Sequence, residues 1–263
     1  MLDLAHLTPQ EVRELIRKND INQPTSGMCK GHIQANVVIV PKSLAYDFLL
    51  FAQRNPKSCP VLDVTDVGSA EPRLMAKGAD LRFDVPKYRI YQFGKLVDEV
   101  PDLRDYWRDD LVCFLLGCSF SFESALANAA IPIRHIEDNH NVPMYITNIE
   151  TEPAGQFHGK MVVSMRPIPY QLVTRAVQAT SRFPQVHGAP IHIGDPSLIG
   201  IKDIHSPDFG DPSIIKEGEV PVFWACGVTP QSIAMTSKPE LMITHAPGHM
   251  FICDPKDEDL AVL

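Results

Sequence analysis

Two stretches of this sequence predict the same local structure, a buried strand that ends at a cysteine-containing turn before a helix. The first consists of an apolar run at 111–116, a break at Gly117, the polar residues Cys118, Ser119 and Ser121, and a helix from Glu123 to Ala130. The second consists of a run at 222–225, the pair Cys226 and Gly227, and a helical segment that begins near Thr229. The first turn of a helix has unpaired N–H groups and the positive end of the macrodipole, which favour an anion. Two such corners predict a pocket for a carboxylate.

The charge balance argues against several classes of partner. The 263 residues include 24 Lys and Arg and 32 Asp and Glu, so the net charge is -8. No cluster of basic residues stands out, which argues against nucleic-acid binding. The apolar runs are too short to span a bilayer, and the N-terminus has no signal-peptide pattern. We therefore expect a cytoplasmic protein that contacts no membrane and that can form a homo-oligomer.

The cysteine pattern favours buried thiols over a disulfide framework or a zinc site. No two cysteines have the Cys-x-x-Cys spacing, and most lie in apolar segments. The six are Cys29, Cys59, Cys113, Cys118, Cys226 and Cys253.

The first part of the chain predicts an α/β arrangement. Thr8, Pro9 and Glu11 form a capping-box pattern at the start of a helix. The segments that follow are a strand at 35–40, a helix at 41–53, a strand at 61–64, a loop at 72–85 and a hairpin formed by 88–93 and 95–100. A strand, a helix and a second strand in succession favour a β-α-β unit with parallel strands.

The middle of the chain predicts a separate, inserted unit. Residues 141–197 contain two strand patterns, a helix pattern and a third strand, at 143–149, 161–168, 169–182 and 189–194. This order is typical of a small antiparallel α+β domain. The remainder, 1–140 and 198–263, predicts a large α/β domain with a mixed sheet, to which the strands at 220–225, 241–244 and 250–253 return.

The sequence resembles the D-glutamate cyclase family along nearly its whole length. The segments that carry the resemblance are Gln34-Ala35-Asn36, Trp107-Arg108-Asp109-Asp110-Leu111, Gly117-Cys118-Ser119-Phe120-Ser121-Phe122-Glu123, Asn141-Val142-Pro143-Met144-Tyr145, Ser164-Met165-Arg166-Pro167-Ile168, Ser181-Arg182-Phe183-Pro184, His187-Gly188-Ala189-Pro190, Gly194-Asp195-Pro196 and Thr244-His245-Ala246-Pro247-Gly248-His249-Met250. Bacterial members of this family are described as hydro-lyases. The resemblance implies a two-domain α/β architecture, and we expect the active site at the junction of the two domains.

The activity that the resemblance implies is the closure of D-glutamate to 5-oxo-D-proline with loss of water. Such a reaction needs a cation for the α-carboxylate, a base for the ammonium proton, and donors for the oxyanion. It needs no redox cofactor, and the sequence has neither a Gly-x-Gly-x-x-Gly motif nor a Walker loop. We expect no cofactor and no metal. Two alternatives stay open: a dehydratase of another small hydroxy or amino acid, and a carboxylate-binding regulatory protein without catalytic activity.

Arg166 and Glu123 are the charged candidates for the site. Arg166 lies in a strand, where its guanidinium can bind a substrate carboxylate through two hydrogen bonds. The alternative is that Arg166 pairs with a nearby acid and joins the domains. Glu123 enters a helix just after the serines, where it can serve as base or acid. A glutamate in a first helical turn can instead simply stabilise the helix dipole.

The remaining candidates are histidines, thiols and hydroxyls. His187 and His245 are candidates for a general base, with a structural histidine as the equal alternative. His245 and His249 have a metal-like spacing, but the Pro and Gly between them disfavour one helical face and hence a zinc site. Cys118 is expected to be a packed residue that does no covalent work, because a free carboxylate is a poor acyl donor. The substrate-binding groups that we expect are Cys118, Ser119 and Ser121 at the first corner, Thr229 at the second, and Arg166 on its strand.

Overall fold

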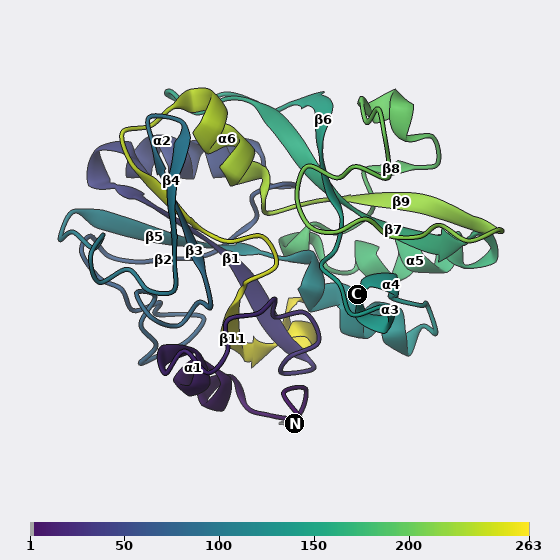
Figure 1. Cartoon of the computed structure of the whole chain (residues 1–263), viewed down its shortest axis with the longest axis horizontal. Helices are drawn as coiled ribbons and strands as arrows, with labels where there is room; N and C mark the ends of the chain where they lie inside the picture. Colours follow the sequence, from purple (N-terminus) through teal and green to yellow (C-terminus); the bar gives the residue numbers. More distant parts are fainter. Residues whose placement is uncertain (1–2, 263) are drawn as a thin grey trace.

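The computed structural model describes residues 3–262, which fold around two β-sheets (Figure 1). The larger sheet has the strand order β2-β5-β1-β10-β3-β4, and β11 also pairs with β1. Its strands are β1 (His32–Pro41), β2 (Val61–Val64), β3 (Tyr88–Gln92), β4 (Lys95–Val100), β5 (Leu111–Gly117), β10 (Met242–His245) and β11 (Phe251–Lys256). The smaller sheet has the order β6-β7-β9-β8. Its strands are β6 (Met144–Glu150), β7 (Lys160–Pro169), β8 (His192–Ile193) and β9 (Glu219–Ala225).

Short helices connect these strands and cover the sheets. The α-helices are α1 (Pro9–Arg17), α2 (Lys42–Arg54), α3 (Glu123–Asn128), α4 (Arg134–Glu137), α5 (Val173–Ser181) and α6 (Thr229–Ser237). The 3-10 turns are η1 (Ser119–Phe122), η2 (Tyr170–Leu172), η3 (Pro184–Val186), η4 (Pro196–Ile199) and η5 (Asp257–Leu260). Among residues 3–262, no helix has the length and apolar character needed to cross a membrane.

Local sequence signals placed several elements correctly. The capping box is present, because the Thr8 hydroxyl accepts from the N–H of Glu11 at 3.3 Å and the Glu11 carboxylate accepts from the N–H of Thr8 at 2.8 Å. The predicted hairpin forms from β3 and β4, with Gln92 paired to Lys95. Its two turn residues, Phe93 and Gly94, both have positive φ, as a two-residue hairpin turn requires.

The prediction that these strands pair in a parallel sheet is wrong, and so is the expected mixed sheet. β1 and β2 run in the same direction, but each pairs antiparallel with β5, which lies between them. Every strand pair in the described part of the larger sheet is antiparallel. The physical reason is that β5 is buried on both faces, and a strand of this kind has the same apolar run in either direction.

The strand at 219–225 lies in a different sheet from the one we expected. The prediction returned this segment to the larger sheet, but β9 pairs with β7 along its length, from Glu219 opposite Pro169 to Ala225 opposite Val163. The smaller sheet therefore takes a central strand from outside 141–197. An apolar run shows that a strand is buried and does not show which sheet buries it. The domain boundaries themselves stay a prediction.

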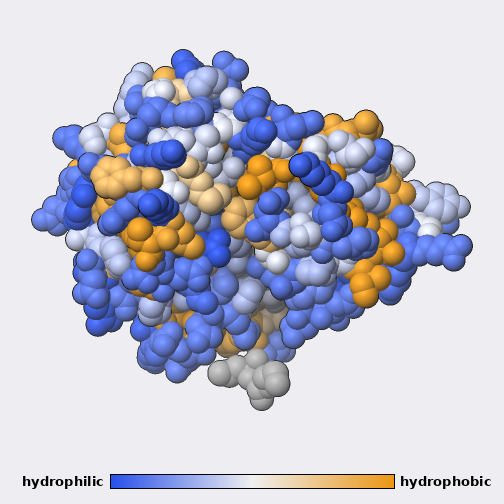
Figure 2. Space-filling model, turned by 45° about the horizontal axis from the view of Figure 1, so that its top comes forward, coloured by the Kyte–Doolittle hydropathy of each residue, from blue (hydrophilic) through white to orange (hydrophobic). Residues whose placement is uncertain are grey.

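The central strands of the larger sheet, β1, β5 and β10, are buried on both faces. On one face the side chains of Val38 and Phe114 pack against Phe48 and Phe51 of α2 and Ile233 of α6, and Figure 1 shows these two helices over the same part of the sheet. The opposite face packs against apolar residues of the long segment between β2 and β5, where the expected loop at 72–85 has neither helix nor strand. On the face drawn in Figure 2, hydrophilic side chains cover most of the surface and hydrophobic ones form scattered patches.

Candidate active site

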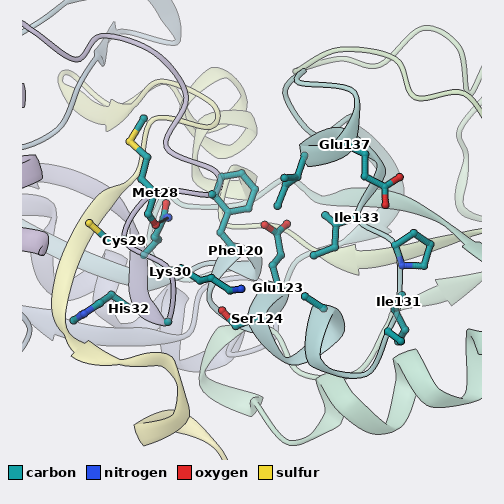
Figure 3. A pocket seen from close by; sticks show the side chains of 17 residues that line it. Met28, Cys29, Lys30, His32, Phe120, Glu123, Ser124, Ile131, Ile133 and Glu137 are labelled. Atoms are coloured by element: carbon teal, nitrogen blue, oxygen red, sulfur yellow. Dashed lines mark hydrogen bonds between the residues drawn. The ribbon is translucent and has the colours of Figure 1, made fainter. Parts of the chain in front are cut away.

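A cavity of about 580 Å³ lies between the loop that precedes β1 and the segment that carries α3 and α4 (Figure 3). Much of its wall is apolar. The apolar side chains include Met28, Phe120, Ile131, Pro132, Ile133 and Ile136. The polar side chains are Lys30, His32, Gln34, Glu123, Ser124 and Glu137. A cavity that is mostly apolar with a few polar groups has the character of a small-molecule site.

The loop on one side of the cavity is fixed by backbone geometry. Gly27, Cys29 and Gly31 all have positive φ, so the chain turns sharply around Lys30. The N–H groups of Cys29 and Lys30 donate to carbonyls of the N-terminal segment at 3.0 and 2.9 Å. This frame leaves the Lys30 side chain exposed, and Figure 3 shows it extending toward Glu123 and Ser124.

Glu123 is the buried acid of the cavity wall. One of its oxygens, Oε1, accepts from Nη2 of Arg166 at 2.6 Å and lies 3.0 Å from Nε2 of His135. The other oxygen, Oε2, accepts a hydrogen bond from the Ser26 hydroxyl at 3.4 Å and from no other group of residues 3–262. Glu123, His135 and Arg166 have exposed fractions of 5, 2 and 0%. Oε2 is thus the oxygen that is available to a bound ligand.

Arg166 reaches Glu123 from β7, behind the cavity. Its guanidinium lies 5.5 Å from the ring centres of both Phe122 and Trp224, and it donates to the hydroxyls of Ser119 and Ser164 at 3.1 and 3.2 Å. The side chain is fully buried and does not line the cavity. These contacts correspond to the structural alternative that the sequence left open, in which Arg166 pairs with an acid.

The neighbouring charges keep Glu123 ionised. Burial alone would raise the pKa of Glu123, but His135 and Arg166 together hold that pKa below its ordinary value. Burial also lowers the pKa of His135, and the charge of Arg166 acts in the same direction. Arg166 and Glu123 therefore form a buried pair of opposite charges, and Nε2 of His135 lies 3.0 Å from the same carboxylate oxygen.

The two predicted corners do lie side by side, but they form packed structure. Asn36 donates to the carbonyl of Gly117 at 2.7 Å and also contacts Gly227, where a Cβ would lie 1.9 Å from its Nδ2. Cys118 and Cys226 belong to one buried apolar cluster, and neither lines the cavity. Burial raises the pKa of the Cys118 thiol well above its ordinary range and that of Cys226 to about 11. All six cysteines are buried, as predicted.

The hydroxyls of the corners hydrogen-bond the main chain. Ser121 Oγ accepts from the N–H of Gln34 at 3.0 Å and donates to its carbonyl at 3.1 Å. Thr229 Oγ1 accepts from the N–H of Val162 at 3.0 Å and donates to the carbonyl of Cys226 at 2.7 Å. Both side chains join neighbouring elements, and neither faces the cavity.

The candidate histidines His187 and His245 do not line the cavity. His187 has φ 81 and its Nδ1 lies 2.9 Å from the carbonyl of Lys57. His245 Nδ1 accepts from the N–H of Val37 at 3.1 Å. Burial lowers the pKa of each to about 4, and neither lines the cavity. His249 contacts the carbonyl of Pro247, and within residues 3–262 no group of three or more His, Cys, Asp or Glu side chains could hold a metal.

The sequence prediction missed two residues of this site, Lys30 and His135. Lys30 lies in a Gly-x-x-x-Gly loop that could have indicated a tight turn, but no local signal points it toward Glu123. His135 lies in α4, which was not predicted. The position of the cavity also differs from our expectation, because none of its lining residues comes from 141–197.

Comparison with known proteins gives consistent results. A family model described as D-glutamate cyclase matches residues 112–254, more than half of the chain. A "putative hydro-lyase" of Psychrobacter arcticus is 88% identical over 263 residues, which cover 100% of both chains. Proteins with the same description from Thermoanaerobacter sp. and Geobacillus kaustophilus are 69% and 64% identical. They align over 99% and 98% of this chain and over 98% of their own length.

Proposed function

Because the chain belongs to the D-glutamate cyclase family, we propose that it is a hydro-lyase that converts D-glutamate to 5-oxo-D-proline and water in the Glu123 cavity. The observation that carries the proposal is an ionised carboxylate held in a largely apolar wall, with one oxygen left for a ligand. An anion in such surroundings favours a cation, and the α-ammonium of an amino acid supplies one.

Glu123 has two tasks in this proposal. Its Oε2 first binds the ammonium group and orients it. The ammonium then loses one proton to solvent, because only the neutral amine has a lone pair with which to attack. When this amine nitrogen attacks the γ-carbon, the new N–C bond makes the nitrogen a much stronger acid than the starting ammonium. Even a carboxylate with a lowered pKa can then take that proton. The reaction is complete when Glu123 passes this proton to the departing hydroxyl group, the C–O bond breaks and water leaves.

The other groups of the site support this step. Arg166 and His135 fix Oε1, so the carboxylate keeps one orientation while Oε2 exchanges the proton. Ser124 lines the same cavity beside Glu123, and its hydroxyl can donate to the oxyanion that forms on the γ-carbon. The wall formed by Ile131 and Ile133 limits water, which favours ring closure over solvation of the open chain.

The experiment is to incubate the purified chain with D-glutamate and to follow the product by proton NMR. We expect 5-oxo-D-proline to appear with the enzyme and not with heat-denatured enzyme. L-Glutamate is the matched stereochemical control. If D-glutamate stays unchanged while a small hydroxy acid in the same assay loses water, the dehydratase alternative is correct. If no substrate of either kind reacts, the protein is a binding module.

A further inference from the structure

We propose that Lys30 binds the α-carboxylate of the substrate and that the γ-carboxyl group lies uncharged against the apolar wall of the same cavity. The inference rests on the proposed function, because it assigns the substrate's groups within the Glu123 cavity. It makes Lys30 a residue that determines specificity, and it predicts which carboxyl group the protein recognises by charge.

The first argument is the charge inventory of the cavity wall. Glu123 is paired with Arg166, and Glu137 lies 3.6 Å from Arg134. His32 is held at both ring nitrogens, by the carbonyl of Asp254 at 2.9 Å and by Lys256 at 2.7 Å. Among residues 3–262, Lys30 forms no ion pair. It is therefore the one cation of the wall that is available to a substrate carboxylate.

The second argument is the position of that cation. The positive φ angles of Cys29 and Gly31 and the main-chain bonds to the N-terminal segment fix the base of the Lys30 side chain at the cavity. In Figure 3 its amine extends toward Glu123. An α-amino acid has its ammonium and carboxylate on one carbon, so opposite charges on adjacent walls fit that pair.

The third argument concerns the second carboxyl group of D-glutamate. One unpaired cation neutralises one carboxylate, and the α-carboxyl is the stronger acid of the two. The γ-carboxyl then faces a wall that contains Ile131, Ile133 and Ile136, and apolar surroundings favour its neutral form. The neutral form also reacts more easily, because attack on it does not place two negative oxygens on the tetrahedral γ-carbon. The charges of the cavity and the chemistry of the reaction therefore both favour a charged α-carboxylate at Lys30 and a neutral γ-carboxyl group at the apolar wall.

The test compares binding of two amides that each lack one charge. D-Isoglutamine has an amide in place of the α-carboxylate, and D-glutamine has an amide in place of the γ-carboxyl. Calorimetric titration of the wild type should show that D-glutamine binds about as well as D-glutamate and that D-isoglutamine binds about ten- to a hundredfold more weakly, the loss expected for one charge-assisted contact.

Lys30→Met completes the comparison. The variant should bind D-glutamate and D-glutamine more weakly than the wild type, by a similar factor, and should bind D-isoglutamine with unchanged affinity. Lys30→Arg should keep most of the wild-type affinity for D-glutamate and D-glutamine. Lys95→Met, an exposed lysine in β4 and not in the cavity, is the matched control. Because Lys30 is exposed, its replacement should not prevent folding.

The outcomes separate this inference from the proposed function. If Lys30→Met binds D-glutamate as tightly as the wild type, or if the wild type binds none of the three compounds, the inference is wrong. If binding follows the expected pattern but no 5-oxo-D-proline forms, the assignment of Lys30 holds and the proposed cyclisation fails.

Discussion

Arg166 Nη2 lies 2.6 Å from Glu123 Oε1 in a buried ion pair that links β7 of the smaller sheet to α3, which follows β5 of the larger sheet. Both charged groups have further polar contacts that offset the cost of their burial, since Arg166 also donates to two serines and Glu123 also contacts His135. The same carboxylate that lines the cavity is thus one half of a contact between the two sheets. Stability and the proposed activity should therefore respond together to changes here.

The Arg166→Met variant should lose about 3–5 kcal/mol of unfolding free energy, because it leaves a buried carboxylate without its partner. Urea denaturation followed by circular dichroism measures this loss. Arg73→Met is the control, because Arg73 pairs with Asp66 on the surface and should change stability by no more than about 1 kcal/mol. If Arg166→Met keeps wild-type stability and only loses affinity for dicarboxylates, Arg166 is a ligand-binding residue instead.

Glu123→Gln should lower the rate of 5-oxo-D-proline formation by about a hundred- to ten-thousandfold, the range for a lost acid-base group. Glu137→Gln, a change of the same kind in the same cavity, should keep most of the activity, because Glu137 is half exposed and contacts Arg134. The NMR assay measures both, below the unfolding temperature of each variant. If both variants lose the same fraction of the rate, Glu123 is not the acid-base group of the reaction.

The cysteines should be unreactive in the folded protein. Burial raises the pKa of Cys29 to about 11 and those of Cys59 and Cys113 to about 12, and it raises the pKa of Cys118 further. The thiolate is the nucleophile, so iodoacetamide at pH 8 should label the unfolded chain and leave the native chain almost unmodified, as mass spectrometry would show. Cys118→Ser should keep most of the activity. Fast labelling of Cys118, or a covalent adduct on it during turnover, would indicate nucleophilic catalysis.

Stability should fall on mild acidification. Burial lowers the pKa of His187 and His245 from 6.5 to about 4, so between these values the unfolded chain binds protons that the folded chain does not. The free energy of unfolding must then decrease as the pH falls from about 6.5 to 4, by up to roughly 3 kcal/mol for each histidine. The lowered pKa of Glu123 adds a loss in the same direction below its ordinary value of 4.5.

Thermal unfolding at pH 7, 6 and 5 measures this dependence. His245→Asn should make the profile shallower, since the amide oxygen can accept from Val37 and does not titrate. The exposed His205, replaced by Gln, should leave the profile unchanged. A wild-type unfolding temperature that is constant from pH 7 to 5 would show that these imidazoles are not buried as described.

The sequence by itself determined those features that depend on neighbouring residues. The capping box of Thr8 and Glu11, the hairpin turn at Phe93 and Gly94, and the burial of β5 follow from local hydrogen bonds, backbone dihedrals and apolar runs. These terms act within a few residues of the chain, so they can be inferred without knowing the fold.

Only the tertiary structure decided the pairings between distant segments. The antiparallel partner of β1, the sheet that contains β9, and the contact of Arg166 with Glu123 each join residues that are far apart in the chain. Arg166 and Glu123 were both site candidates from the sequence, but their pairing with each other was not predicted. Lys30 and His135 were not among the predicted site residues. Hydrophobic burial is non-directional, so an apolar run can be buried against many partners. The fold selects one of them, and that choice brings the charges of the cavity together.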